Sequence, residues 1–443
     1  MAPVATELAQ STSERIQSLK EQAKADEDVS VFNPFYSPSI GDDGDASYEH
    51  AQYKPFFPKV SWPPLTEVEV VDRAQFADPS KKNLLGAASK VITLNPTIGT
   101  ELHGIDLRQL SEAQKDELYV FLRFEEHSLS IRSALLVAER GAVCKSSLVC
   151  SLSSELTSHP CSLPRPRDRY QRTTGARPSL RTSAQACDDA YSSDRPGGST
   201  WSVPVVYNDS SRRPDPAAFS ALELWHSDVS YELQPPSTTS LKVIAGPEYG
   251  GDTLWSSGYA LFSSFSPGFQ KYLEGLSAVH SGVAQAEGSR AAGLHVRREP
   301  VESVHPVVRV HPVTGFKSIY VNPGFTRRIV GVPKAESDAL LQLLFQQLSQ
   351  NPEFQVRFRW EKIRLSSGFV DNRIVTHSAT FDFWPARRHA LRATPHGEKP
   401  ISVAEYEASG KVAKDRRIEV WRQQGLEPPH VGGGPAKVRG YND

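Results

Sequence analysis

The sequence predicts a mainly β protein with flanking helices (α+β). Beyond residue 200 the chain runs through many short strand-like segments bounded by turn residues, and only a few segments have helical spacing. This combination is typical of a β-sandwich or barrel decorated by helices. With 443 residues, 38% of them hydrophobic and 9% aromatic, the chain can bury a sizeable core as one large domain or two smaller ones.

Each predicted element follows from local spacing. VITLNPTIGTELHGIDL (91–107) alternates apolar and polar residues around Gly and Pro turns, so we expect order to begin near Val91 with a pair of strands. SEAQKDELYVFLRF (111–124) has helical spacing, and Ser111 with Gln114 makes a capping box at its start. Later predicted strands are WSVPVVY, TSLKVIAG, GDTLWSS, HPVVRVHPVTG and SIYVNPG, and later predicted helices are FQKYLEGL and ESDALLQLLFQQL.

Composition predicts the domain organisation. Residues 1–60 are polar and read as an N-terminal tail, residues 61–410 as the main domain, and residues 411–443 as a C-terminal tail. Residues 125–200 interrupt the domain, because Ser, Arg and Pro rise there, lysine nearly vanishes, and neither Phe nor Trp occurs. We expect a loop or irregular segment. Two interpretations stay open, a gene-model error such as a frameshift and an unusual insertion.

Charge and targeting features argue against several classes of partner. Fifty basic and 51 acidic side chains give a formal net charge of -1, which favours neither nucleic acid nor an anionic membrane as a partner. No segment is long and apolar enough to span a bilayer, and the first thirty residues lack an apolar signal region. The expected location is therefore the cytoplasm. Whether the chain forms a homo-oligomer stays open.

The four cysteines argue against two further kinds of site. They all fall between Cys144 and Cys187 and contain no CxxC pair. A disulfide framework is normally spread across the fold, and structural zinc sites usually contain closely spaced cysteine pairs. Neither a disulfide scaffold nor a zinc site is expected.

A candidate metal site lies in ALELWHSDVSYEL. His226 and Asp228 are two residues apart, so on an extended strand both side chains leave the same face. With a second imidazole they would form the 2-His-1-carboxylate triad, which leaves three positions of an octahedral Fe(II) open for a 2-oxo acid and O2. The alternative is a surface histidine beside an aspartate. The second imidazole comes from DNRIVTHSATFDFWPARRHALRATPHGEKP, where His377 precedes a dense set of arginines.

Two arginines and one threonine are candidates for binding anions. Arg388 can hold a carboxylate through a bidentate fork, and Arg392 lies on the same side of the segment whether it is a strand or a helix. Two cations on one side of a cavity call for two anions, although a solvated basic strand is the alternative. In PEYGGDTLWSS, Thr253 follows a Gly-Gly turn and offers a hydroxyl to a carboxylate oxygen.

Together these motifs resemble a known family. WHSDV, PPSTTSLKVIAGPEYGGDTLWSS, HPVVRVHPVTG, VNPGFTRRIV and DNRIVTHSATFDFWPARRHALRAT are similar to the taurine and sulfonate dioxygenases of the 2-oxoglutarate-dependent superfamily, particularly their fungal branch. The resemblance covers most of residues 91–124 and 201–400 and implies a double-stranded β-helix, or jelly roll. It also implies site residues: His226, Asp228 and His377 on iron, Thr253 and Arg388 on 2-oxoglutarate, Arg392 on the sulfonate, and Phe325 lining the substrate pocket.

The resemblance further implies the reaction. The expected cofactor is Fe(II), with 2-oxoglutarate and O2 as cosubstrates and no catalytic residue beyond the metal centre. A small anionic substrate such as taurine would be hydroxylated next to sulfur, giving sulfite, an aldehyde, succinate and CO2. Alternatives are the same chemistry on an alkyl sulfate, an aryloxyalkanoate or xanthine, and an impaired chain, because residues 125–200 keep only the opening of the family's RGVVFFR-type strand.

Overall fold

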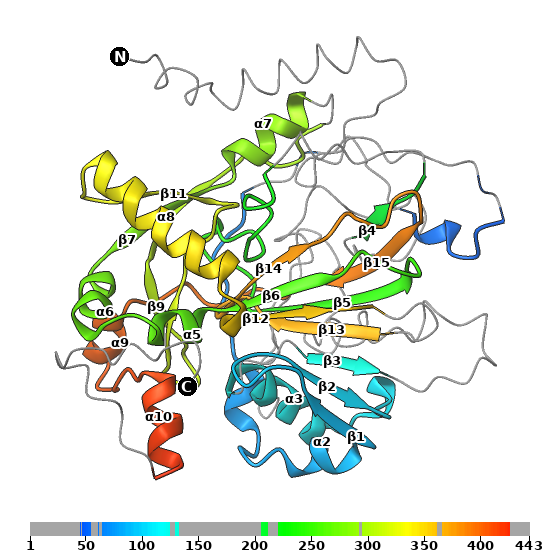
Figure 1. Ribbon diagram of the computed structural model, residues 1–443, viewed down its shortest axis with the longest axis horizontal. Coiled ribbons are helices and arrows are strands. Elements are labelled where there is room, and N and C mark those ends of the chain that lie inside the picture. The colour runs from blue at the N-terminus through cyan, green and yellow to red at the C-terminus, as the bar shows by residue number, and fades with distance from the viewer. Residues whose placement is uncertain are drawn as a thin grey trace, which may run out of the picture.

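The computed structural model describes residues 45, 47–54, 61, 64–124, 129–132, 205–210, 220–291, 295–360 and 366–425. In these parts of the chain, strands form the centre and helices lie around them (Figure 1). The predicted fold class, mainly β with flanking helices, is confirmed.

The largest sheet has seven strands. From one edge to the other they are β1 (Lys90–Thr93), β2 (Thr100–His103), β3 (Leu129–Arg132), β13 (Ser366–Asp371), β5 (Thr238–Ala245), β15 (Arg388–Ala393) and β4 (Val205–Asn208). The β2–β3 pair is parallel, and the other pairs are antiparallel. The antiparallel pairing of β1 with β2 confirms the strand pair predicted after Val91.

Three smaller sheets complete the β structure. Their strand orders are β12 (Gln355–Phe358), β6 (Thr253–Ser257), β14 (Val375–Ala379); β11 (Thr326–Ile329), β7 (Ser277–Ser281), β8 (Glu302–Pro306); and β10 (Lys317–Ile319), β9 (Val308–Val310). Val243 of β5 and Ala390 of β15 share one buried cluster with Trp255 of β6 and Val375 of β14. The β12–β6–β14 sheet therefore packs across a core from the large sheet.

Helices cover the edges and outer faces. They are α2 (Lys82–Ala87), α3 (Glu112–Phe124), α5 (Gly258–Ser263), α6 (Pro267–Glu274), α7 (Val283–Ala291), α8 (Lys334–Gln350), α9 (Val403–Ala408) and α10 (Arg416–Gln423), with 3-10 turns η1 (Ala51–Tyr53), η2 (Arg73–Phe76), η3 (Leu107–Gln109) and η4 (Pro352–Phe354). The predicted capping box starts α3, since the Ser111 and Gln114 side chains each accept a hydrogen bond from the other residue's backbone N–H. None of the described helices could cross a membrane.

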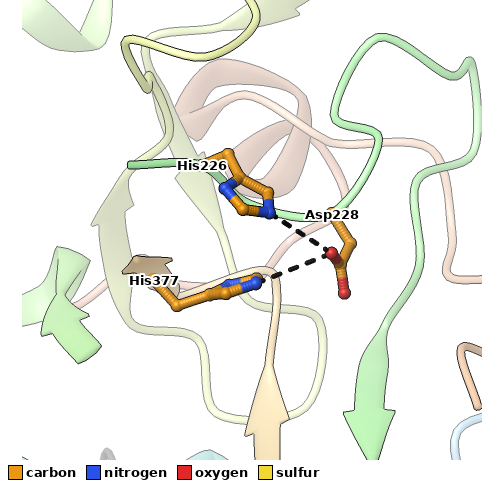
Figure 2. A group of neighbouring side chains, drawn as sticks. All are labelled: His226, Asp228 and His377. Carbon is orange, nitrogen blue, oxygen red and sulfur yellow. Dashed lines mark ion pairs between the residues drawn. The ribbon is translucent and has the colours of Figure 1, made fainter. Parts of the chain in front are cut away.

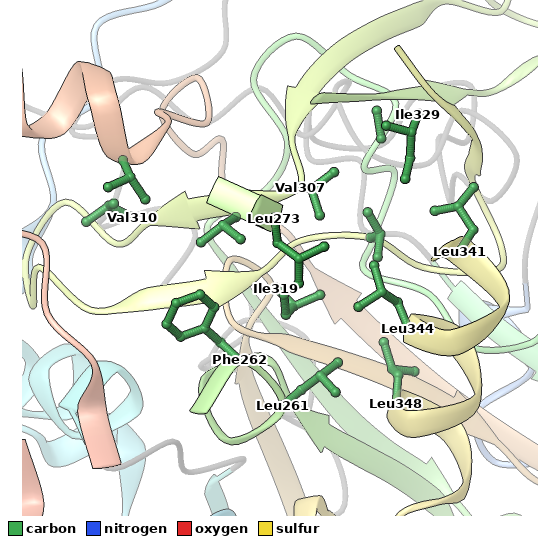
Figure 3. Close-up of a cluster of buried hydrophobic side chains, with 14 of the residues drawn as sticks. Leu261, Phe262, Leu273, Val307, Val310, Ile319, Ile329, Leu341, Leu344 and Leu348 are labelled. Atoms are coloured by element: carbon green, nitrogen blue, oxygen red, sulfur yellow. The ribbon is translucent and has the colours of Figure 1, made fainter. Parts of the chain in front are cut away.

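The longest helix, α8, is attached by an apolar stripe. Leu341, Leu344 and Leu348 recur at helical spacing and are at most 5% exposed. They pack in one cluster with Phe262 of α5 and Ile319 of β10 (Figure 3). This cluster joins α8 and α5 to the β9–β10 ribbon, and Leu254 of β6 packs against it.

The structure differs from the sequence prediction at both predicted tails. Turn η1 lies within the predicted N-terminal tail, and α10 lies within the predicted C-terminal tail. Asp415 caps α10 by accepting hydrogen bonds from two backbone N–H groups, and its carboxylate also accepts one from Ser263 of α5 at 2.8 Å. This capping signal was overlooked. Order also begins before Val91, with η2 and α2.

The anomalous interval contains one described strand. Residues 129–132 form β3, between β2 and β13, so the expectation of an irregular segment is wrong for these four residues. The backbone groups of the two neighbouring strands need partners, and this short segment supplies them on both sides. Residues 133–200 lie outside the described part of the chain.

Candidate active site

The three candidate ligands come from two neighbouring segments. His377 lies on β14, and His226 forms an isolated bridge with it through backbone hydrogen bonds of 2.9 and 2.8 Å. Asp228 instead begins a turn, in which Val229 has a φ of +36°. The predicted extended strand carrying both His226 and Asp228 is therefore wrong in detail, because only His226 pairs with a strand.

The three side chains nevertheless converge. Oδ1 of Asp228 lies 3.7 Å from Nε2 of His226 and 3.7 Å from Nε2 of His377 (Figure 2). One ligand atom from each residue falls within 4.8 Å of the other two. The Asp228 side chain is 2% exposed, whereas those of His226 and His377 are 22% and 15% exposed. The site is therefore a buried carboxylate beside two partly open imidazoles.

Hydrogen bonding orients the His226 ring, and burial keeps the His377 ring neutral. Nδ1 of His226 lies 2.7 Å from the carbonyl oxygen of Leu224, so it carries the proton and leaves the Nε2 lone pair facing Asp228. Burial, followed by the neighbouring His226, lowers the pKa of His377 to about 4. Two imidazole nitrogens and one carboxylate are the donor set of a mononuclear Fe(II) site, so the residues present fit iron.

Two side chains hold the Asp228 carboxylate, and a third holds its backbone. Thr239 donates a hydrogen bond to Oδ2, and Arg392 donates one of 2.8 Å to Oδ1. The backbone N–H of Asp228 donates to Oδ1 of Asn372 at 3.3 Å. Thr239 and Asn372 were not predicted from the sequence, where their only signals are polar residues within the STTS and DNR segments.

Arg388 is a buried cation at the start of β15. It is 4% exposed, and burial lowers its pKa to about 10 despite the charge of Asp252. Its Nε donates to the carbonyl oxygen of Gly251 at 3.1 Å, and within the described ranges no carboxylate lies at ion-pair distance from it. A buried guanidinium without a salt bridge fits an incoming carboxylate.

Thr253 follows the Gly-Gly turn that contacts Arg388. Gly251, which accepts the Arg388 hydrogen bond, is two residues before Thr253 and has a φ of +67°. A Cβ at Gly251 would lie 3.1 Å from Cδ of Arg388, so a glycine permits this approach. Oγ1 of Thr253 accepts a hydrogen bond of 3.0 Å from the Trp360 indole, which leaves its own proton to donate elsewhere.

Strand alternation places both arginines toward the core between the sheets. Arg388, Ala390 and Arg392 share one face of β15, and Ala390 packs in the cluster that contains Trp255 of β6. Leu391 belongs to the other face, where it packs with Val205 and residues of the N-terminal segment. Both candidate anion-binding residues thus face the sheet that carries His377.

Phe325 lies beside the triad. Its ring meets His226 edge to face at a centroid distance of 6.0 Å and meets Tyr231 at 5.0 Å. Gly324 leaves room for this loop, since a Cβ there would lie 3.0 Å from Cβ of His226. Phe325 is 4% exposed, so it forms a wall next to an imidazole of the centre.

A buried ion cluster fixes the turn between β13 and β14. Arg373 binds both carboxylate oxygens of Asp371 at 2.8 and 2.6 Å and also contacts Asp72 at 2.9 Å and Glu398 at 3.1 Å. Both Asp371 and Arg373 are at most 1% exposed. This cluster ties the N-terminal part of the domain to the turn that carries Asn372.

Comparisons with known proteins decide the family. Residues 179–394 match the family described as "Taurine catabolism dioxygenase TauD, TfdA family". A Schizosaccharomyces pombe protein, provisionally named an alpha-ketoglutarate-dependent sulfonate dioxygenase, is 37% identical over 357 residues, which cover 80% of this chain and 81% of that protein. The chain belongs to the TauD/TfdA family. It is therefore an alpha-ketoglutarate-dependent, that is 2-oxoglutarate-dependent, dioxygenase, as the sequence predicted.

Further relatives are similar to this chain in sequence and fold. The alpha-ketoglutarate-dependent sulfonate dioxygenase of Saccharomyces cerevisiae is 34% identical over 355 residues, covering 78% of this chain and 76% of that protein. A Burkholderia xenovorans crystal structure, provisionally described as an alpha-ketoglutarate-dependent taurine dioxygenase, superposes with a TM-score of 0.50 at 26% identity and covers 71% of this chain and 95% of that one. The chain is also similar to the alpha-ketoglutarate-dependent sulfate ester dioxygenase of Pseudomonas putida, 31% identical over 213 residues, covering 45% of this chain and 69% of that protein.

Proposed function

We propose that this TauD/TfdA protein is an Fe(II)-dependent enzyme that hydroxylates an organosulfonate such as taurine at the carbon next to sulfur. With 2-oxoglutarate and O2 as cosubstrates, the products are sulfite, an aldehyde, succinate and CO2. The observation that carries the proposal is the convergence of Nε2 of His226 and of His377 on Oδ1 of Asp228. We also propose that the two facing sheets form a double-stranded β-helix around this centre.

His226, Asp228 and His377 would hold the iron. When bound, iron with 2-oxoglutarate and O2 supplies the oxidation of a C–H bond, and the protein's contribution is to hold the reactants in place. His226 keeps its Nε2 lone pair available because its Nδ1 proton is committed to the Leu224 carbonyl. The wall formed by Phe325 supports a pocket for the organic part of the substrate beside the centre.

Arg388 and Thr253 would bind the far carboxylate of 2-oxoglutarate. Arg388 is buried and carries no salt bridge to a described carboxylate, so an incoming anion would meet an already desolvated guanidinium. Thr253 would add its hydroxyl proton, since the Trp360 indole occupies the acceptor side of its oxygen. Together they would orient the cosubstrate.

Arg392 would bind the anionic group of the substrate. Its guanidinium donates to Oδ1 of Asp228, the oxygen nearest both imidazoles. A divalent cation at that oxygen would repel the guanidinium and compete for the same lone pairs. Arg392 would then turn toward the substrate anion, which supplies a replacement partner.

The test is product analysis with defined substrates. Purified protein with Fe(II), 2-oxoglutarate and O2 is expected to release sulfite and succinate in equal amounts from taurine or another alkylsulfonate. Succinate formation that does not respond to any sulfonate would contradict the sulfonate assignment.

A second candidate substrate is an alkyl sulfate, favoured by the similarity to the Pseudomonas putida sulfate ester dioxygenase. Hydroxylation of the carbon next to the ester oxygen would release sulfate in place of sulfite, so the same assay separates the two. An aryloxyalkanoate or xanthine would release neither ion. A chain impaired by residues 125–200 would produce no succinate with any of these substrates.

A further inference from the structure

Asp228 belongs to a closed ring of hydrogen bonds with two buried polar residues. Thr239 of β5 donates its hydroxyl proton to Oδ2 of Asp228, and Nδ2 of Asn372 donates to Oγ1 of Thr239 at 2.8 Å. The ring closes where the backbone N–H of Asp228 donates to Oδ1 of Asn372 at 3.3 Å. The three residues are 2%, 5% and 0% exposed, so water does not substitute for these contacts easily.

The direction of each hydrogen bond is fixed by chemistry. The Nδ2 group of Asn372 can only donate, so the Thr239 oxygen accepts from it and must direct its single proton elsewhere. That proton points to Oδ2 of Asp228. Oδ2 is therefore engaged on the side of β5, while Oδ1 lies 3.7 Å from both histidine Nε2 atoms.

Asn372 is held in place by contacts with the protein core and does not depend on the proposed metal centre for its position. Its backbone N–H donates to the carbonyl oxygen of Ser237 at 2.9 Å. Its neighbours Asp371 and Arg373 are fixed in the buried ion cluster that includes Asp72 and Glu398. The ring thus has a rigid anchor that does not depend on a bound metal.

We propose that Thr239 and Asn372 are positioning residues that present a single oxygen, Oδ1 of Asp228, to the metal. This inference rests on the proposed assignment of His226, Asp228 and His377 as ligands. Groups that hydrogen-bond to a ligand orient it and typically change metal affinity by about 10- to 100-fold when removed. Without Thr239, the carboxylate could rotate and lose the alignment of Oδ1 with both imidazoles.

The chain offers a matched control. Thr238 is 4% exposed, and its hydroxyl is buried without a hydrogen-bond partner in the described structure. Thr239→Val and Thr238→Val therefore make the same chemical change at adjacent positions of β5, but only the first removes a contact to Asp228. Thr239→Ser keeps the hydroxyl and serves as the rescue variant.

The experiment measures Mn(II) binding by equilibrium dialysis of the full chain, without 2-oxoglutarate or substrate. The unfolding temperature of each variant is also measured with and without Mn(II). The difference between the two values reports metal binding, because a substitution that only lowers stability lowers both values alike. We expect Thr239→Val and Asn372→Ala to weaken Mn(II) binding by about 10- to 100-fold. Thr239→Ser is expected to retain most of the affinity, and Thr238→Val to match the wild type.

Two results would overturn different claims. If the wild type binds Mn(II) more tightly than His377→Ala, but Thr239→Val binds it as tightly as Thr238→Val, the positioning role is wrong and the metal site stands. If the wild type and His377→Ala bind Mn(II) equally, the ligand assignment itself is wrong. If Thr239→Val does not fold, the Mn(II) affinities of Asn372→Ala and Thr238→Val are compared instead, and the same two conclusions apply.

Discussion

Nη1 of Arg392 donates a 2.8 Å hydrogen bond to Oδ1 of Asp228, the same oxygen that lies 3.7 Å from both imidazole Nε2 atoms. A metal ion bound at this site would therefore compete with the Arg392 guanidinium for Oδ1 of Asp228. Both side chains are largely buried, Asp228 at 2% and Arg392 at 15% exposed. Metal binding and the position of Arg392 should therefore be linked.

Replacing Arg392 with Ala should strengthen metal binding while weakening substrate binding. A hydrogen bond to a charged group contributes about 1.5 to 3 kcal/mol, so removing this competitor should tighten Mn(II) binding by about 10- to 100-fold. The KM for the sulfonate should rise in the same variant. The measurements are Mn(II) dialysis and steady-state kinetics, with Arg387→Ala as control because Arg387 pairs with Asp45 instead. Unchanged Mn(II) affinity would show that the competition is absent.

Replacing Arg388 with Ala should mainly raise the KM for 2-oxoglutarate. The loss of a desolvated charge pair costs about 2 to 5 kcal/mol. Arg388→Lys should recover little, because an ammonium cannot form the bidentate fork. KM values for 2-oxoglutarate and for the sulfonate are measured side by side. If Arg388→Ala and Arg392→Ala both weaken only 2-oxoglutarate, Arg392 is misassigned and the argument for an anionic substrate fails.

The buried His389 should make stability fall in acid. Burial lowers its pKa to about 3, whereas the pKa of an exposed histidine is about 6.5. Below that pH the unfolded chain binds a proton that the folded chain does not, so stability present above about pH 6.5 is lost as the pH falls toward 3.

His389→Gln removes this group and tests the effect. The slope of unfolding free energy against pH should decrease by about 1.4 kcal/mol per pH unit between about pH 6 and 4. Urea unfolding across this range measures the slope, which is compared instead of absolute stability because His389 also contacts Tyr48. The exposed His295→Gln is the control. An unaltered slope in His389→Gln would refute the buried-neutral assignment.

The sequence predicted the fold class and the identities of the converging residues. Alternation, turn residues and helical spacing are local properties, so the β1–β2 pair and helices α3, α6 and α8 follow from them. His226, Asp228 and His377 could be selected because few residue types bind iron and the motifs came in a familiar order. The types of these three residues, however, do not predict the path of the backbone that connects them.

The parts that were missed depend on contacts distant in sequence. Only His226 bridges to His377, and Asp228 lies in the turn that follows; no local pattern reveals a contact between segments so distant in sequence. Thr239 and Asn372 are ordinary residues for a strand and a turn, and only their contact across two segments gives them a role. Strand β3 is four residues long and is supported by partners on both sides, so its own sequence carries little signal.

The most direct test of the metal centre is the Fe(II) content of the wild type and of His377→Ala after anaerobic dialysis, with His295→Ala as control. The wild type and the control should each retain one Fe(II) per chain and form succinate when substrate and O2 are added. His377→Ala should retain no Fe(II) and form no succinate, because it lacks one of the two neutral ligands. A His377→Ala protein that keeps one Fe(II) per chain and full turnover would contradict the account.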